Sequence, residues 1–162
     1  MSTARTHIID DDEAIRDALQ WLFKTRGVAC RTWASGEGFL EAWSPQWRGC
    51  IVLDIRMAGM SGLECFDTLL ARGCELPVIF ITGHGDVPMA VEAMRIGAMD
   101  FMEKPFNPER LTELVKKASQ ARRMTLEYMK YLAVLGREGM RRILREPPTR
   151  TPPSVPTEKA PA

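Results

Sequence analysis

The chain has few of the residues that build sulfur-rich or histidine-rich metal sites. Its 162 residues include four cysteines and two histidines, and no two cysteines form a C-x-x-C pair. A zinc or iron–sulfur centre is therefore not expected. The cysteines are most simply explained as small core residues in a reducing compartment, which predicts a cytoplasmic protein.

Long hydrophobic runs are also missing. The apolar stretches are only a few residues long, whereas a membrane-spanning helix needs about 20 apolar residues. No signal peptide precedes the first strand-like run, "THIID". We therefore expect no association with a membrane.

The net charge of +1 hides a strong asymmetry along the chain. Residues 1–115 contain 11 lysines and arginines against 17 acidic residues, whereas residues 116–162 contain 11 against four. Such a basic tail is able to attract nucleic acid or an acidic protein surface. A solvated helix with a disordered end explains the same charge without a partner, and no nucleic-acid-binding motif accompanies it.

Five short apolar runs alternate with five helical patterns. The runs are "THIID", "VACRTW", "CIVLD", "LPVIFIT" and "MDFME", which begin at residues 6, 28, 50, 76 and 99. Strands that are apolar on both faces are typical of a parallel sheet covered by helices on both sides. The pattern predicts an α/β protein with the flavodoxin-like (βα)5 fold, a three-layer sandwich with sheet order 2-1-3-4-5 and a C-terminal helical extension.

Local signals predict where the helices begin and which faces they bury. Ser61 and Glu64 form a capping box, and Asn107 with Pro108 combines an N-cap with proline at the first helical position. The expected apolar faces are Leu63, Phe66 and Leu70 in the third helix, and Val87, Ala90, Val91 and Met94 in the fourth.

Beyond the fifth helix the chain changes character. We expect residues 1–121 to form the main domain, residues 122–146 a basic helical extension, and residues 147–162 a disordered, proline-rich tail. The extension has apolar residues at heptad spacing: Ala121, Met124, Tyr128, Tyr131 and Leu135. This seam indicates either self-pairing of the extension or a fifth helix that simply continues.

Polar residues stand at the ends of four of the five strands. Asp10 and Asp11 close the first, Asp54 the third and Thr82 the fourth, and Lys104 follows the fifth. The carboxyl ends of parallel strands meet at one edge of the sheet, and ligands bind there where the strand order reverses. Taken singly, each residue is explained as a cap, a turn or a surface residue. Their coincidence predicts one site.

Converging carboxylates need positive charge nearby. Two carboxylates about 4 Å apart repel each other by about 4 kcal/mol at an effective dielectric constant of about 20. Lys104 supplies one positive charge, and Mg²⁺, a hard cation that prefers oxygen ligands, would supply two more. A cation held by carboxylates beside a free aspartate, with a lysine and a hydroxyl opposite, is suited to phosphoryl transfer.

Three segments resemble the receiver domain of two-component response regulators, specifically its FixJ-type branch: "HIIDDDEAIRDAL", "VLDIRMAGMSGLE" and "PVIFITGHGDVPMAVEAMRIGAMDFMEKPF". The resemblance implies that Asp54 accepts a phosphoryl group from a sensor histidine kinase. Asp11, Asp54 and the main-chain oxygen of Arg56 would hold Mg²⁺ or Mn²⁺, and Asp10 would assist through water. Such a phosphoprotein catalyses its own phosphorylation and dephosphorylation and is not a turnover enzyme.

The same resemblance implies a switch. Thr82 would hydrogen-bond the new phosphoryl group, Lys104 would pair with it, and Phe101 would turn inward as Thr82 moves. The peptide bond before Pro105 would be cis. The face formed by the fourth helix, the fifth strand and the fifth helix would then mediate phosphorylation-dependent homodimerisation or binding of a target protein.

Two features depart from the family. Ala58 stands where the family commonly has proline, which predicts a looser loop after the third strand. FixJ-type regulators usually carry a helix-turn-helix domain, and residues 122–162 contain no such pattern, so DNA binding is not supported by the residues present.

Arg56 and His84, two positions after Asp54 and Thr82, flank the expected path of the hydrolytic water and are expected to tune dephosphorylation.

Two other functions are compatible with the sequence. One is a FixJ-type transcription regulator that is shortened at its DNA-binding end or acts through its basic tail. The other is a Mg²⁺-dependent phosphatase with an aspartate nucleophile. Haloacid-type phosphatases place a second aspartate two residues after the first, where this chain has Arg56, which argues against the phosphatase.

Overall fold

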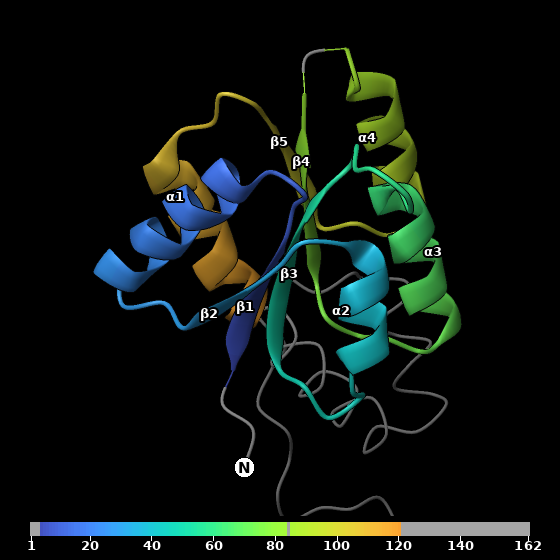
Figure 1. Ribbon diagram of the computed structural model, residues 1–162, viewed down its shortest axis with the longest axis horizontal. Helices are drawn as coiled ribbons and strands as arrows, with labels where there is room; N and C mark the ends of the chain where they lie inside the picture. The colour runs from blue at the N-terminus through green and yellow to red at the C-terminus, as the bar shows by residue number, and fades with distance from the viewer. Residues whose placement is uncertain (1–3, 84, 121–162) are drawn as a thin grey trace, which may run out of the picture. The chain divides into compact units, whose positions relative to one another are not determined.

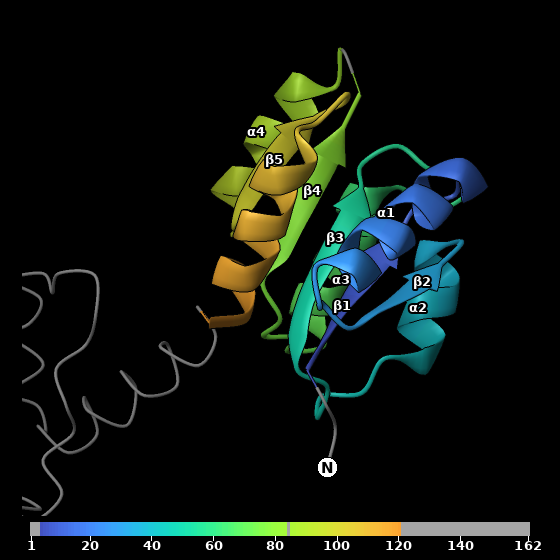
Figure 2. The same ribbon diagram turned by 90° about the vertical axis from the view of Figure 1, so that its left-hand side faces the viewer.

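The sheet at the centre of the fold has five parallel strands in the order β2-β1-β3-β4-β5. The computed structural model describes residues 4–83 and 85–120. The strands are β1 (Arg5–Ile9), β2 (Cys30–Trp33), β3 (Gly49–Asp54), β4 (Val78–Thr82) and β5 (Asp100–Glu103). Figure 2 shows β5 and β4 at one end of the sheet and β2 at the other. The predicted strand order is confirmed.

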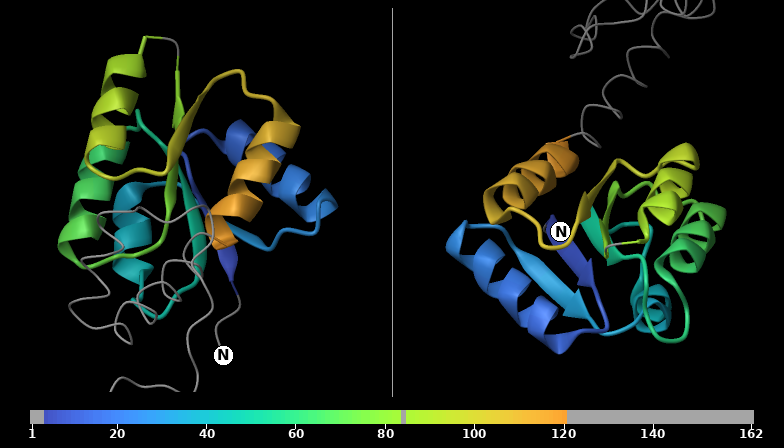
Figure 3. Two further views of the ribbon diagram at one scale, coloured as in Figure 1. Left: turned by 180° about the vertical axis from the view of Figure 1, so that it is seen from behind. Right: turned by 90° about the horizontal axis from the view of Figure 1, so that it is seen from above.

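Helices cover both faces of this sheet. They are α1 (Glu13–Thr25), α2 (Gly36–Ala42), α3 (Gly62–Ala71), α4 (Val87–Arg95) and a helix over residues 108–120. α2, α3 and α4 lie on one face, and α1 and the helix over residues 108–120 lie on the other (Figures 1 and 3). None of the helices in the described part of the chain is long and apolar enough to cross a membrane.

The alternation of side chains along the central strands builds two cores. Ile51, Leu53, Val78 and Phe80 pack under α2, α3 and α4, whereas Cys50, Val52, Ile79 and Ile81 pack under α1 and the helix over residues 108–120. All of these side chains are at most 2% exposed. Successive residues of a strand point to opposite faces, so a strand covered on both sides must be apolar throughout.

The predicted helix starts are occupied by the expected caps. The Ser61 hydroxyl accepts the Glu64 backbone N–H at 3.2 Å, and the Glu64 carboxylate accepts the Ser61 N–H, which completes the capping box. Asp12 caps α1 by accepting the Ala14 N–H. These side chains satisfy backbone donors that the first turn of a helix leaves free.

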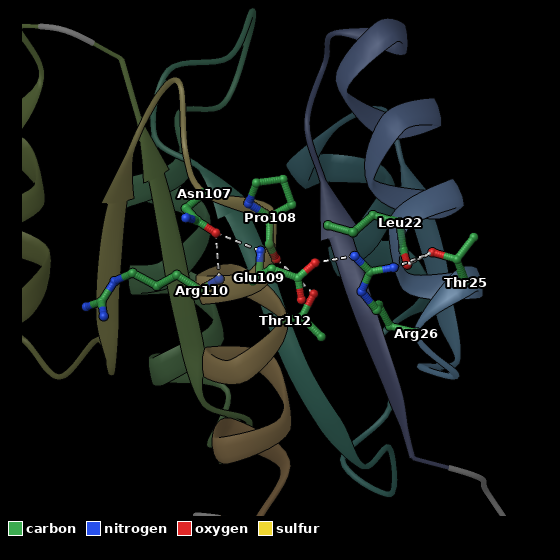
Figure 4. A network of polar contacts seen from close by, with 8 residues as sticks. All are labelled: Leu22, Thr25, Arg26, Asn107, Pro108, Glu109, Arg110 and Thr112. Atoms are coloured by element: carbon green, nitrogen blue, oxygen red, sulfur yellow. Dashed lines mark hydrogen bonds and ion pairs between the residues drawn. The ribbon is translucent and has the colours of Figure 1, made fainter.

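Figure 4 shows how α1 is joined to the helix over residues 108–120. Arg26, at the C-terminal end of α1, forms an ion pair with Glu109. The Asn107 side-chain oxygen caps the helix over residues 108–120 by accepting the N–H groups of Glu109 and Arg110 at 2.9 and 3.1 Å. Because both charged side chains reach solvent, the ion pair contributes little to the stability of the fold.

The buried faces of α3 and α4 differ from the predicted ones. In α4 the buried residues are Ala90 and Ala93, and Val91 and Met94 are 52% and 38% exposed. In α3, Leu70 is 41% exposed, and the neighbouring Leu69 is buried in its place. Small alanines let α4 lie close to the sheet, and hydrophobic spacing alone does not distinguish two adjacent rows on one helix.

Several predictions from the sequence concern residues outside the described ranges. They are the basic helical extension over residues 122–146 with its heptad seam, the proline-rich tail over residues 147–162, and the role of His84.

A cluster of aromatic rings holds a buried histidine beneath α2. His7, on β1, is 3% exposed and stacks on Trp47 with ring centroids 4.6 Å apart. The indole N–H of Trp33 donates to His7 Nδ1 at 3.2 Å, so that nitrogen must be unprotonated. Burial, with further contributions from Arg31 and Arg5, lowers the pKa of His7 from 6.5 to about 4.

This cluster predicts acid sensitivity of the fold. Below pH 6.5 the unfolded chain binds a proton at His7 that the folded chain does not, so the parent should lose stability relative to His7→Phe between pH 6.5 and 4, by up to about 3 kcal/mol. Urea unfolding of the protein and of His7→Phe across this range measures the difference. Parallel pH dependences in the two proteins would contradict the prediction.

Candidate functional site

Three carboxylates meet at the carboxyl edge of the sheet. Asp54 is the last residue of β3, and Asp10 and Asp11 directly follow β1. One carboxylate oxygen of each lies within 4.8 Å of the others. Asp10 and Asp54 are 2% and 5% exposed, whereas Asp11 is exposed to solvent. The parallel pairing of β1 with β3 brings these distant residues together, as the sequence predicts.

Lys104 brings a positive charge to two of these carboxylates. Its Nζ lies 3.5 Å from Asp10 Oδ2 and 3.5 Å from Asp54 Oδ1. Its backbone N–H donates to the Thr82 carbonyl at 2.7 Å, which continues the pairing of β4 with β5 to the edge of the sheet. The peptide bond between Lys104 and Pro105 is cis.

A single ammonium does not balance the carboxylates. Burial, together with the charges of Asp10 and Asp11, raises the pKa of Asp54 to about 6 although Lys104 opposes the shift. Burial also raises the pKa of Asp10, against the opposing effects of the Asp12 N–H and Lys104. At neutral pH the ionised site therefore holds unfavourable charge, which a cation would relieve.

Thr82 supplies a hydroxyl without a protein partner. Its side chain is 0% exposed, and Oγ1 neither accepts nor donates a hydrogen bond within the described residues. Phe101 is half-buried and packs in the core that contains Phe80, under α4. Thr82 follows Phe80 by two positions on β4, so Thr82 and Phe101 lie on the same face of the sheet.

The loop after β3 is pressed against the base of α3. A side chain at Gly62 would place its Cβ 2.2 Å from the Asp54 carbonyl oxygen and 2.8 Å from Ile55 Cα. The Gly62 N–H donates to the Ile55 carbonyl at 2.8 Å. Only glycine allows this close approach. From the sequence, Gly62 was part of a helix start with no expected role at the site.

Ala58 makes a contact that proline is unable to make. Its backbone N–H donates to Asp11 Oδ2 at 2.9 Å. The sequence predicts a looser loop here because Ala58 replaces the proline common in the family. The structure instead shows this hydrogen bond, which ties the loop after β3 to the carboxylate that follows β1.

Arg56 and Asp86 join two loops at the rim of the site. Arg56 Nη2 lies 2.6 Å from Asp86 Oδ1, and Arg56 Nε lies 3.1 Å from the same oxygen. Hydrogen bonding to Arg56 lowers the pKa of Asp86. Asp86, which with Pro88 is typical of a helix start, is the N-cap residue of α4, but its side chain makes no capping hydrogen bond and binds Arg56 instead. The sequence contains no signal for this pair.

The residues at this edge fit a hard divalent cation. The three carboxylates offer oxygen ligands within a small volume, and burial together with the charges of Asp10 and Asp11 raises the pKa of Asp54. Mg²⁺ prefers such oxygen donors, and it is bound by only one or two carboxylates with waters completing the shell. Cysteine and histidine are absent from this group of side chains.

An open parallel α/β fold places its ligand site at the strand-order reversal, and here an acidic group, a buried threonine and a paired lysine occupy that position. Residues 6–116 match the response regulator receiver domain, and the chain belongs to this family. Receiver domains are signalling proteins that sensor histidine kinases phosphorylate, and they typically bind Mg²⁺ at an aspartate cluster.

Curated relatives and solved structures agree with this assignment. The chain is 50% identical over 117 residues to the C4-dicarboxylate transport transcriptional regulatory protein DctR of Rhodobacter capsulatus, covering 71% of this chain and 59% of the relative. It is 51% identical over 110 residues to the transcriptional regulatory protein FixJ of Azorhizobium caulinodans, covering 68% and 52%. The chain thus spans little more than half the length of these relatives.

A crystal structure of FixJ-N superposes with a TM-score of 0.68 at 45% identity, covering 74% of this chain and 96% of that one. Full-length FixJ from B. japonicum superposes with a TM-score of 0.73 at 38% identity, covering 79% and 63%. The flavodoxin-like receiver fold predicted from the sequence is confirmed.

The charge at this site predicts that Asp54 weakens the fold. Because its pKa rises from 3.8 to about 6 on folding, the ionised carboxylate costs on the order of 3 kcal/mol above pH 6. Without divalent cations, Asp54→Asn should be more stable than the parent at pH 7, and the gain should vanish as the pH falls to about 4.

Thermal unfolding in a chelating buffer at several pH values measures this difference. Asp67→Asn, on the exposed side of α3, removes one charge away from the site and serves as the matched control. Equal melting temperatures of the parent and Asp54→Asn at pH 7 would show that the carboxylates are not in conflict.

Proposed function

We propose that this chain is a phosphoacceptor in which Asp54 receives a phosphoryl group from the phosphohistidine of a sensor kinase. The observation that carries the proposal is the convergence of Asp54, Lys104 and the unpartnered Thr82 hydroxyl at one edge of the sheet. Membership of the receiver family supports the same assignment.

In the transfer, a carboxylate oxygen of Asp54 attacks phosphorus and the bond between phosphorus and the imidazole nitrogen breaks. The electron pair of that bond stays on the imidazole, and an acyl phosphate forms on Asp54. Hydrolysis reverses the modification: water attacks phosphorus, the bond to the Asp54 oxygen breaks, and inorganic phosphate and a proton leave. Lys104 neutralises the phosphoryl oxygens throughout, from a position it already occupies beside Asp54.

The acidic residues would hold Mg²⁺ or Mn²⁺ during both steps. Asp11, Asp54 and the main-chain oxygen of Arg56 would be ligands, and Asp10 would contribute through water. When bound, the cation balances the negative charge of the phosphoryl oxygens. Hydrogen bonds from the Asp12 N–H to Asp10 and from the Ala58 N–H to Asp11 keep both carboxylates facing the site.

The output would follow from the buried hydroxyl. A phosphoryl group on Asp54 adds acceptor oxygens for the Thr82 hydroxyl, which has no hydrogen-bond partner within the described residues of the unmodified protein. Movement of Thr82 toward these oxygens would free space for Phe101 to turn inward. The affected surface is the face of α4, β5 and the helix over residues 108–120, where Val91 and Met94 are exposed. This face would mediate homodimerisation or binding of a target protein.

A second function has support from the relatives. The similar proteins DctR and FixJ are named transcriptional regulatory proteins, and each is longer than the matched segment of this chain. A DNA-binding role here would depend on residues 122–162, which are basic. The phosphatase reading is not favoured, because receiver domains are not turnover enzymes and Arg56 stands where a second catalytic aspartate would be needed.

Phosphorylation is tested with acetyl phosphate and Mg²⁺. The full chain should gain one phosphoryl group by intact mass, and Asp54→Asn should gain none because the amide that replaces the carboxylate beside Lys104 is unable to form an acyl phosphate. Asp67→Asn should label like the parent. Size-exclusion chromatography of the labelled protein reports dimer formation, and an unlabelled parent would refute the proposal.

Dephosphorylation should depend on the residues two positions after Asp54 and Thr82. We expect Arg56→Met and His84→Ala each to change the lifetime of the phosphoprotein by about threefold or more while leaving the labelling yield largely intact. Arg56 is 71% exposed at the rim of the site, so its loss should not disturb the fold. Following the decay of the intact mass measures both lifetimes, and unchanged decay in both variants would contradict this role.

A further inference from the structure

The Arg56–Asp86 pair connects the two loops that carry the phosphorylation site. Arg56 belongs to the loop after β3, two residues beyond Asp54, and Asp86 belongs to the loop between β4 and α4, four residues beyond Thr82. Three donor–acceptor contacts join them, with Nη2–Oδ1 at 2.6 Å, Nε–Oδ1 at 3.1 Å and Nε–Oδ2 at 3.3 Å. Two guanidinium nitrogens therefore engage the carboxylate, and the two shortest contacts share Oδ1.

The two partners differ in their freedom to move. The Asp86 side chain is 10% exposed, and its backbone N–H and carbonyl are engaged by Gly83 and by the first turn of α4. The Arg56 side chain is 71% exposed. A guanidinium on a long, solvated side chain reorients far more easily than a carboxylate fixed at a helix start, so Arg56 is the member that is able to change partner.

Phosphorylation would create a competing partner for Arg56. The phosphoryl group adds one to two negative charges and new acceptor oxygens at Asp54, only two residues from Arg56. Arginine binds phosphate and carboxylate with the same fork, so the two anions compete for one guanidinium. If Arg56 leaves, the Asp86 carboxylate keeps its hydrogen bond from the Gly83 backbone but loses the arginine, and it becomes able to cap α4, a role that it does not perform in this structure.

We propose that Asp86 is a positioning residue that holds Arg56 away from Asp54 in the unmodified protein, and that phosphorylation transfers the Arg56 guanidinium from Asp86 to the phosphoryl group. This inference rests on the proposed phosphoacceptor function. It adds a second connection from the site to α4, independent of Thr82 and Phe101. The guanidinium then covers the phosphoryl group against water, and Asp86 limits this protection by competing for it.

The lifetime of the phosphoprotein tests the competition. Asp86→Asn keeps the size of the side chain and removes its charge, so Arg56 should remain on the phosphoryl group and the lifetime should lengthen by about threefold or more. In an Arg56→Met background the same substitution should have no effect, because its whole influence passes through Arg56. Asp86→Glu, which restores the charge, should return the lifetime toward that of the parent.

Glu92→Gln provides the matched control. Glu92 pairs with Arg95 on the exposed surface of α4 at 3.6 Å, so its substitution removes one acidic ion-pair partner from the same helix without touching the loops of the site. Its lifetime should equal that of the parent. A change of the same size in Glu92→Gln and Asp86→Asn would overturn the inference, because it would reflect the charge of α4 and not the position of Arg56.

Nuclear magnetic resonance of the parent protein gives a readout that needs no Asp86 variant. Because Nε donates to both Asp86 oxygens, the Arg56 Nε–H signal should be protected from solvent exchange in the unmodified protein and should shift on labelling with acetyl phosphate and Mg²⁺. A signal that does not move on labelling would overturn the partner exchange. Failure of the parent to label at all would instead refute the phosphoacceptor function itself, so the two outcomes are distinct.

Discussion

The site depends on carboxylates that a parallel sheet gathers and buries at its edge, where burial and mutual repulsion both oppose their ionisation. Asp10 and Asp54 are almost fully buried, and Lys104 offers them one ammonium at 3.5 Å from each. A domain of this size has only about 5–15 kcal/mol of stability to lose, so an ionised Asp54 with a pKa near 6 is a substantial cost. That cost is the reason the site favours a cation and a residue that changes its charge.

The fold tolerates these buried carboxylates because its core is apolar and most of its helix starts are capped. β3 and β4 are apolar on both faces and fill two separate cores, and the helix starts at Asp12, Ser61 and Asn107 satisfy their own backbone donors. Gly62 allows the start of α3 to lie directly against the Asp54 carbonyl, with no space for a side chain between them. The packed strands and capped helices therefore fix the positions of the carboxylates at the edge of the sheet.

The sequence predicts the parts of this arrangement that follow from strand direction and periodicity. Apolar runs that end in Asp54 and Thr82 must reach one edge of a parallel sheet, so the sequence alone indicates where the site lies. The sequence does not predict which residues of α4 face the core. Val91 and Ala90 both fit a helical period, and only contact with the sheet decides that Ala90 is buried. The sequence does not predict the Arg56–Asp86 pair either, because hydrophobic periodicity does not indicate which loops lie close together.

Asp86 illustrates why such contacts matter for function. As a helix cap it would be an ordinary structural residue, and the sequence favours that interpretation. In the structure its carboxylate binds Arg56, and α4 begins without a side-chain cap. One carboxylate thus has two possible uses, capping α4 or holding Arg56, and it does not serve both fully. A residue with two mutually exclusive partners is the simplest physical basis for a switch, because any new charge at Asp54 changes which partner is preferred.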